Sequence, residues 1–192
     1  MQITSGGSRG KKLSFSESLH IRPTSDKVRS AIFDIIRLNI KGSKFLDLFA
    51  GTGAVGIQAL SEGAILSCFV EENWKCINII KKNINGLNFN EKAMIVKKKV
   101  ENFLSDSDVD DKLKDFDFIF LDPPYNLTDN EYEFIIQRLS FHVCSNTTVI
   151  VEHSSKRLGS DFFMKFGFAD YKLKKYGDTA LSILYKWNYE KS

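Results

Sequence analysis

Long hydrophobic runs are missing from this chain of 192 residues, and cysteine and proline are scarce, with three residues of each. No apolar run approaches the roughly 20 residues that a membrane helix needs. Residues 1–12 contain no apolar core of the signal-peptide type. We therefore expect a cytoplasmic protein without a membrane partner.

The cysteines Cys68, Cys76 and Cys144 do not form a binding pattern. Their number is odd, and their spacing fits neither a disulfide framework nor a zinc site. The three histidines are scattered along the sequence. We predict no metal site, and we expect Cys68 and Cys76 to be buried thiols in a strand and a helix.

Charge is distributed unevenly along the sequence. The formal net charge is +3, but residues 1–44 contain nine Lys/Arg and three Asp/Glu, a net charge of +6, and the remainder carries −3. The basic N-terminal part indicates either a polyanionic partner or a solvated basic surface. Hydrophobic residues make up 43% of the chain, which is ordinary for a globular domain with a sizeable core.

The order of the expected elements predicts an α/β protein. Strand-like runs alternate with helical patterns, which is typical of a parallel sheet covered by helices on both faces. The last two runs are closely spaced and indicate an antiparallel hairpin at one edge of a mostly parallel, seven-stranded sheet. The expected strands are 44–49, 65–71, 93–97, 116–121, 147–152, 168–174 and 181–187, and the expected helices begin near residues 26, 54, 73, 101 and 129.

Several local expectations concern side-chain placement. Residues 5–10 are rich in glycine and predict a hairpin or a mobile basic loop. Residues 105–115 have the first spacings of a calcium loop but lack its glycine and glutamate, so a solvated loop is expected. Helical spacing places Trp74 on a buried face with Ile77, Ile80 and Ile84. In the first helix, Ser25 or Thr24 can act as the N-cap, and Arg29 and Arg37 are expected away from its buried face.

Residues 51–56, Gly-Thr-Gly-Ala-Val-Gly, match G-x-G-x-x-G between an expected strand and an expected helix. Gly51 and Gly53 stand where the backbone must approach a ligand closely. Glu71 ends the next strand, where a carboxylate can accept hydrogen bonds from both hydroxyls of a ribose. An NAD site is the rival interpretation and would share this feature. Asp47, which lies in the preceding strand four residues before Gly51, argues against it.

The sequence Asp122-Pro123-Pro124-Tyr125 follows the expected strand 116–121. The Asp122 carboxylate and the Pro123 carbonyl can each accept one hydrogen of an exocyclic amine, which would redirect its lone pair, and two prolines hold these acceptors in place. Tyr125 offers a ring on which a base can stack after it has flipped out of its helix. By itself, the tetrapeptide is more typical of a tight turn after a strand, and its position after the fourth strand of this pattern favours the catalytic interpretation.

The glycine motif followed by Asp-Pro-Pro-Tyr resembles the class I S-adenosylmethionine-dependent methyltransferases that modify exocyclic amines of nucleobases. The resemblance implies a Rossmann-like fold and S-adenosylmethionine as the cofactor. It places the carboxylate of Asp47 near the cationic part of the cofactor. The usual adenine-binding Asp or Asn would fall close to Lys99, so backbone groups near Val100, or Glu101, are the remaining candidates for that contact.

Nearly the whole chain resembles the bacterial 16S ribosomal RNA (guanine-N2)-methyltransferases, the RsmD-like family. The resemblance includes residues 5–13 and the sequence Arg-Pro-Thr-Ser-Asp-Lys-Val-Arg at 22–29. It implies one methyltransferase domain over 1–192, with a basic hairpin extension at 1–25 and a catalytic core at 26–192. It also implies 16S ribosomal RNA in an assembling small subunit as the partner. The candidate cofactor contact in these segments is Thr24, and the candidate RNA contacts are Arg9, Lys11, Lys12, Arg22 and Arg29.

Two alternatives remain open. A DNA adenine- or cytosine-N methyltransferase would share Asp-Pro-Pro-Tyr, but such enzymes usually carry a separate recognition region for which this chain has no spare length. A non-catalytic RNA-binding module could keep the fold, although the intact motif residues argue against a dead site. We expect a monomer because nothing in the sequence demands a partner subunit.

Overall fold

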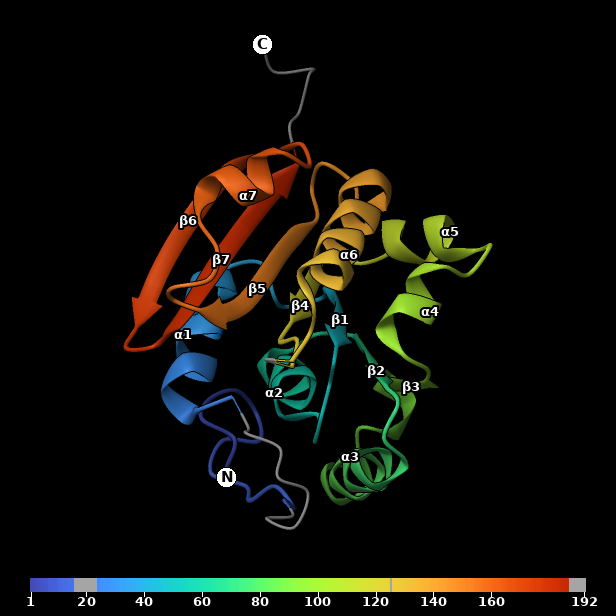
Figure 1. Ribbon diagram of the computed structural model, residues 1–192. Coiled ribbons are helices and arrows are strands. Elements are labelled where there is room, and N and C mark those ends of the chain that lie inside the picture. The colour runs from blue at the N-terminus through green and yellow to red at the C-terminus, as the bar shows by residue number, and fades with distance from the viewer. Residues whose placement is uncertain (16–23, 125, 187–192) are drawn as a thin grey trace. The chain divides into compact units, whose positions relative to one another are not determined.

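The computed structural model describes residues 1–15, 24–124 and 126–186, so the candidates Arg22 and Tyr125 lie outside it. The chain forms two compact units, Met1–Lys99 and Val100–Ser192. Figure 1 labels the helices and strands along the chain. The single domain expected over residues 1–192 stays a prediction. Among the described residues, no helix combines the length and apolar character that crossing a membrane requires.

The first unit contains three parallel strands in the order β3-β2-β1. Their register pairs Asp47 with Phe69 and Glu71 with Lys97, so the carboxyl ends of all three strands lie at one edge. The strands predicted in this part of the sequence are thereby confirmed. In chain order the unit contains α1 (Asp26–Ile36), β1 (Lys44–Leu48), α2 (Ala54–Glu62), β2 (Leu66–Glu71), α3 (Trp74–Leu87), the 3-10 turn η2 (Asn90–Lys92) and β3 (Ala93–Lys97).

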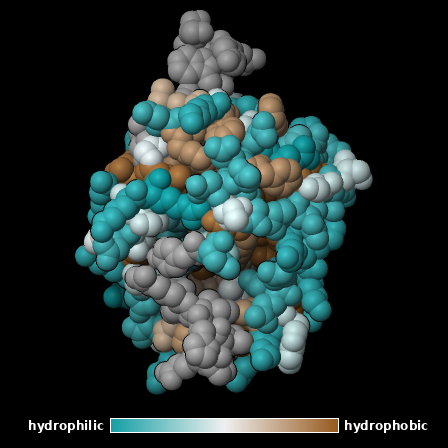
Figure 2. Space-filling view, viewed as in Figure 1, coloured by the Kyte–Doolittle hydropathy of each residue, from teal (hydrophilic) through white to brown (hydrophobic). Residues whose placement is uncertain are grey.

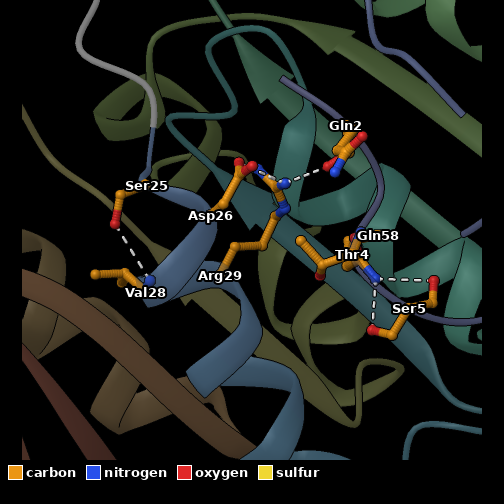
Figure 3. A network of polar contacts seen from close by, with 8 residues as sticks. All are labelled: Gln2, Thr4, Ser5, Ser25, Asp26, Val28, Arg29 and Gln58. Atoms are coloured by element: carbon orange, nitrogen blue, oxygen red, sulfur yellow. Dashed lines mark hydrogen bonds and ion pairs between the residues drawn. The ribbon is translucent and has the colours of Figure 1, made fainter. Parts of the chain in front are cut away.

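The N-terminal residues form a short hairpin that docks on α2, which confirms the first of the two expectations for this segment. Gln2 and Lys12 form an antiparallel bridge. Gln58 of α2 is fully buried beneath the hairpin. Its Nε2 donates to the Ser5 carbonyl at 3.1 Å and to Ser5 Oγ at 3.0 Å, and its Oε1 accepts from the Thr4 N–H (Figure 3). Both ends of one amide side chain therefore fasten the hairpin to the helix.

Helix α1 begins as expected, but one of its side chains points the other way. Ser25 is the N-cap and accepts a hydrogen bond from the Val28 N–H at 3.2 Å. Arg29 was expected away from the buried face, and this is wrong, because its side chain has no exposed surface. Its Nη2 donates to the Gln2 carbonyl and, at 2.9 Å, to Asp26 Oδ1 (Figure 3). The docked hairpin thus supplies the cover that the helical pattern alone does not reveal.

Helix α3 also differs from expectation at one residue. Ile77, Ile80 and Ile84 are buried as predicted, whereas Trp74 is 58% exposed, so its predicted burial is wrong. Trp74 is the first residue of the helix, and Asn73 caps it by accepting from the Lys75 N–H. The buried face of α3 therefore begins after its first residue, so helical spacing overestimates the length of that face.

The second unit contains four strands in the order β4-β5-β7-β6. Strands β4 and β5 are parallel, and β7 is antiparallel to both β5 and β6. The expected antiparallel hairpin is therefore confirmed. The elements are α4 (Val100–Leu104), α5 (Val109–Lys114), β4 (Phe118–Leu121), α6 (Asp129–His142), β5 (Thr148–Ser154), α7 (Ser160–Met164), β6 (Phe168–Tyr176) and β7 (Thr179–Lys186).

The solvated loop expected at 105–115 is only partly correct. Residues of this segment form α5, and Val109 and Leu113 are buried. Both α4 and α5 pack against α6. Hydrophilic side chains cover most of the face shown in Figure 2. The acidic residues of this segment are mostly exposed, as expected, while its two apolar residues anchor it.

Candidate active site

The glycine loop between β1 and α2 is shaped by unusual backbone conformations. Phe49 has φ +62° and Gly53 has φ +77°. Such a conformation is strained for an aromatic residue, by about 1–3 kcal/mol, and strain of this kind gathers at functional sites. Gly53 has no room for a side chain, because an added Cβ would meet Ile80 at 2.9 Å. The sequence identified the glycines but contained no signal for the turn at Phe49.

Asp47 holds the start of α2 in place. Gly53 is the N-cap of α2 and has no side chain with which to satisfy the first N–H groups of the helix. The buried carboxylate of Asp47 takes this role from the neighbouring strand, and its Oδ2 accepts from the Gly56 N–H at 2.9 Å. Asp47 therefore lies at the loop, as predicted, and it has a structural role that the sequence did not reveal. Its predicted contact with the cationic part of the cofactor stays a prediction.

Glu71 closes the other side of the same loop. Its Oε2 accepts from the Gly51 N–H at 2.8 Å, and its Oε1 accepts from the Asn73 N–H at 2.8 Å. Burial raises the pKa of this half-buried carboxyl, and the Glu72 charge raises it further, while hydrogen bonds from the backbone of Asn73, Gly51 and Glu72 lower it only in part. Each carboxylate oxygen has more than one lone pair, so both can still accept a hydroxyl. The residues present therefore fit the ribose of a nucleoside cofactor.

The remaining candidates of the first unit lie elsewhere. Thr24 is buried next to the Ser25 cap. Arg9, Lys11 and Lys12 are exposed around the hairpin turn. Arg29, in contrast, lacks the exposed surface that a phosphate contact requires. Of the five predicted RNA contacts, the structure places three on the surface and buries one, and Arg22 is not described.

In the second unit, the residues after β4 form a braced loop. All four residues of β4 are buried, whereas Asp122 and Pro123 are partly exposed. Thr128 begins α6 with a capping box, in which its Oγ1 accepts from the Glu131 N–H and its backbone N–H donates to Glu131. Asp122 therefore lies in the sequence between a buried strand and the capped start of α6.

Arg157 fastens this loop from the end of β5. Its Nη2 donates to the Leu127 carbonyl at 2.7 Å and to Asp129 Oδ1 at 2.9 Å. Its guanidinium lies 5.2 Å from the ring centroid of Tyr132. Tyr132 is buried, and burial raises the pKa of its hydroxyl, while the Arg157 charge lowers it and the Asp122 charge raises it by smaller amounts. Neither Arg157 nor Tyr132 belongs to a recognisable motif, so neither could be predicted as a site residue from the sequence.

Two further candidates begin α4. Val100 is buried and Glu101 is half-buried. The structure therefore leaves Glu101 partly accessible and encloses the Val100 side chain, and the predicted adenine contact through backbone groups near Val100 or through Glu101 stays a prediction. In the part of the chain that is described, no cluster of His, Cys, Asp and Glu has the composition of a metal site.

Known proteins resemble this chain in sequence and in fold. A family model described as Conserved hypothetical protein 95 matches residues 1–185. Ribosomal RNA small subunit methyltransferase D of Buchnera aphidicola is 36% identical over 124 residues, which are 65% of this chain. The same stretch is 62% of that protein, so the match spans less than two thirds of the relative.

Two solved structures show the same architecture. A hypothetical protein of Thermus thermophilus has a TM-score of 0.78 and 26% identity, over 96% of this chain and 99% of that chain. The T. thermophilus 16S rRNA N2 G1207 methyltransferase RsmC, solved with AdoMet and guanosine, has a TM-score of 0.66 and 18% identity, over 87% of this chain and 44% of that chain. The predicted class I, Rossmann-like methyltransferase fold is thereby confirmed. On the strength of the family match, this chain belongs to the RsmD-like family described as Conserved hypothetical protein 95.

Proposed function

We propose that this chain is an S-adenosylmethionine-dependent methyltransferase that modifies the N2 amine of a guanine in 16S ribosomal RNA. The observation that carries the proposal is the glycine loop held between Asp47 and Glu71 at the carboxyl edge of the strands. Glu71 would bind the ribose hydroxyls and the loop backbone would approach the cofactor. When bound, the cofactor supplies an electrophilic methyl group. We further propose a cytoplasmic monomer that acts on the assembling small subunit.

The Asp122 loop is proposed to orient the target amine. The guanine amine is a poor nucleophile because its lone pair is delocalised into the ring. The Asp122 carboxylate and the Pro123 carbonyl would each accept one amine hydrogen and direct the lone pair toward the methyl group, which is catalysis mainly by positioning. The base would be flipped and stacked on Tyr125. No covalent nucleophile is needed, and Cys76 is unsuited to the role because burial raises its pKa to about 11.

The test is transfer of radiolabelled methyl from S-adenosylmethionine to small subunits without the modification, to naked 16S ribosomal RNA and to duplex DNA. The labelled nucleoside is then identified by digestion and mass spectrometry. N2-methylguanosine from a ribosomal substrate supports the proposal, and label in DNA would replace it with the DNA methyltransferase alternative. Cofactor binding without label in any substrate would reject ribosomal RNA as the substrate, and a lack of cofactor binding would favour the non-catalytic alternative.

Acid pH should weaken cofactor binding because of Glu71. A protonated carboxyl loses most of its strength as an acceptor, and since the pKa of Glu71 is raised, affinity should fall at a higher pH than an ordinary glutamate would give. Glu71→Gln should bind the cofactor about tenfold more weakly at neutral pH, a typical loss for a hydrogen bond to a charged group. Isothermal titration calorimetry across the pH range measures both effects.

Glu72→Gln is the matched control, since it removes the same charge from the exposed neighbouring residue. Its cofactor affinity at neutral pH should equal that of the wild type. The pH at which affinity falls should move down, because the Glu72 charge contributes to the raised pKa of Glu71. An identical pH profile for wild type and Glu71→Gln would remove Glu71 from the binding site.

Loss of Arg157 should affect turnover more than cofactor binding. Arg157→Gln removes the two donated hydrogen bonds that fasten Leu127 and Asp129. A misplacement of about 1 Å in a positioning site can cost up to 100-fold in rate, so we expect kcat to fall roughly tenfold while cofactor affinity stays constant. Lys156→Gln, a charge change at the exposed neighbour, should leave kcat unaltered. Equal kcat values for both variants would show that the brace has no catalytic effect.

The basic hairpin turn should contribute to RNA affinity through charge alone. Replacing Arg9, Lys11 and Lys12 by Gln removes three exposed cations. If each contacts one phosphate of a single strand, the slope of log K against log salt should fall in magnitude by about 2. Filter binding to 16S ribosomal RNA fragments between low and moderate salt measures this slope. A slope identical to that of the wild type would place the turn outside the interface.

A further inference from the structure

We propose that the first unit carries a second RNA-binding surface, which takes single-stranded nucleotides of the RNA substrate. This inference rests on the proposed function for its partner. We name this surface the Trp74 surface, and it consists of Trp74, Lys75, Lys97, Lys98 and Lys99. One unpaired base would stack on Trp74, and the lysines would neutralise the neighbouring phosphates.

The strand register places Lys97 beside Glu71, and the other four residues follow one of these two closely in the sequence. Glu71 and Lys97 are Cα partners in adjacent strands, which lie about 4.8 Å apart. Lys98 and Lys99 continue from the end of β3, and Trp74 and Lys75 begin α3 immediately after the turn that follows Glu71. All five residues are exposed, and the face over α3 in Figure 2 is coloured mainly as hydrophilic. The surface therefore adjoins the carboxylate proposed to hold the ribose.

The exposure of Trp74 is the observation that needs an explanation. The residue is 58% exposed, while Ile77, one turn further along the helix, is only 6% exposed. The ammonium of Lys75 lies 5.9 Å from the centroid of the indole. An accessible aromatic ring with a cation beside it is the combination with which single-stranded nucleic acids are bound, since every base has a face that can stack. In a duplex the base faces are already stacked and inaccessible, so the surface favours unpaired RNA.

The lysines have a competing explanation that covers only part of the pattern. Strand β3 is the outermost strand of its sheet, and a lysine within an edge strand hinders pairing with other chains. This accounts for Lys97. Lys98 and Lys99 follow the last residue of the strand, where there is no strand edge to protect. Residues 1–99 as a whole contain sixteen Lys/Arg and eight Asp/Glu, a net charge of +8, whereas residues 100–192 carry −5.

The tip of the hairpin does not provide an RNA contact beside the glycine loop, although its two strands pack near that loop. The tip docks at Ser61, whose carbonyl accepts from the Gly7 N–H at 2.8 Å. Ser61 is seven residues beyond Ala54, the start of α2, which is about 10 Å along the helix axis. An RNA strand that is bound only at this tip would lack a contact near Glu71. The Trp74 surface supplies a contact at that edge.

Fluorescence of Trp74 tests the stacking directly. The chain has two tryptophans, and Trp187→Phe leaves Trp74 as the single reporter. With S-adenosylhomocysteine at saturation, a single-stranded oligoribonucleotide should quench this emission, and a duplex of the same sequence should not. Trp74→Ala should bind the single strand about tenfold more weakly, and Trp74→Phe should retain most of the affinity. Unquenched emission together with unchanged affinity of Trp74→Ala would overturn the proposal.

Charge removal with a matched control tests the lysines. Lys97, Lys98 and Lys99 are replaced by Gln in one variant, and the equally exposed Lys41, Lys82 and Lys92 of the same unit in the other. The first variant should reduce the magnitude of the salt slope for single-stranded RNA by about 2, and the control should leave it unchanged. Aggregation of the first variant with unaltered RNA affinity would assign the lysines to edge protection and reject the RNA surface.

These binding measurements separate the surface from the proposed reaction. They require no methyl transfer. If the wild type gives the expected quenching and salt slope but labels no ribosomal substrate, the proposed function is rejected and the RNA-binding surface is retained. Methylation of ribosomal RNA at the wild-type rate by both Trp74→Ala and the Lys97/Lys98/Lys99 variant, with unchanged KM, would reject the surface and keep the function. Melting temperatures equal to that of the wild type ensure that these exposed substitutions report on binding.

Discussion

Replacing Asp122 by Asn will nearly abolish methyl transfer and leave cofactor binding almost intact. The substitution keeps the shape of the side chain but exchanges the carboxylate for an amide. The amide oxygen is a weaker hydrogen-bond acceptor than a carboxylate oxygen, and the amide NH2 group adds two donors that oppose the amine hydrogens. Removal of one positioned group that stabilises developing charge typically costs about 100- to 1000-fold in kcat. We expect a loss of this size in single-turnover rates with small subunits as substrate.

The control for this prediction is Asp111→Asn. Asp111 is exposed on α5 of the same unit, where it forms an ion pair with Lys114 at 3.6 Å, so the charge change is the same and the position is remote from the loop. It should retain the wild-type rate. Calorimetry with S-adenosylmethionine should give the same affinity for both variants. If Asp122→Asn lost cofactor binding while its melting temperature was unchanged, Asp122 would have a cofactor role in place of the one proposed.

The elements of the fold were predictable because their signals are local. Strand β1 and helix α2 are adjacent in the sequence, and the glycines between them mark the turn by their freedom of backbone conformation. The position of Glu71 followed from the end of the next apolar run. Parallel strands place these ends at one edge, so the proximity of Glu71 to Gly51, now seen as a 2.8 Å hydrogen bond, could be expected without coordinates.

The errors arose where distant segments decide burial. Arg29 lies on a helix whose apolar spacing predicts only one buried face, and its cover comes from the Gln2 backbone, 27 residues away in sequence. In this position two of its nitrogens, Nε and Nη1, have no hydrogen-bond partner among the described residues. Burial of such a cation lowers its pKa. No sequence pattern would have favoured this arrangement.

The braces around the candidate site were equally hidden from the sequence. The spacing from the glycines identifies Asp47 as a candidate. Its hydrogen bond from the Gly56 N–H, however, depends on how β1 and α2 pack together, which the sequence does not show. Arg157 reaches Leu127 from 30 residues away. Motifs identify the groups that would touch a ligand, whereas the groups that hold them in position act across the fold, and their spacing in sequence is unconstrained.

Gly6→Ala will detach the N-terminal hairpin from α2, whereas Gly10→Ala will not. The two glycines have nearly the same backbone conformation, with φ +79° and +81°, so alanine is strained at both by about 1–2 kcal/mol. Only at Gly6 would the added Cβ collide with another backbone group, the Ser61 carbonyl. At Gly10 no atom lies within 4 Å of the added Cβ.

A small shift of the Ser61 carbonyl cannot relieve this collision, because Ser61 belongs to α2 and its carbonyl cannot move independently of the helix. The hairpin itself must therefore move away. The Gly7 N–H and the Ser8 N–H would lose their bonds to Ser61, each worth about 0.5–1.5 kcal/mol net. Ile3 and Leu13 would lose their packing against Ala50 and Ala54, which flank the glycine loop. We expect the free energy of unfolding to fall by about 3–5 kcal/mol for Gly6→Ala and by about 1–2 kcal/mol for Gly10→Ala.

Urea denaturation gives both free energies, and calorimetry with S-adenosylmethionine reports whether the hairpin supports the cofactor loop. Since the hairpin packs on the residues beside that loop, Gly6→Ala should bind the cofactor several-fold more weakly, with faster proteolysis of the N-terminal segment, while Gly10→Ala should match the wild type in both. Equal losses of stability in the two variants would mean that the docking contacts add nothing beyond backbone strain. A fully detached hairpin with unchanged cofactor affinity would limit its role to the RNA contacts of Arg9, Lys11 and Lys12.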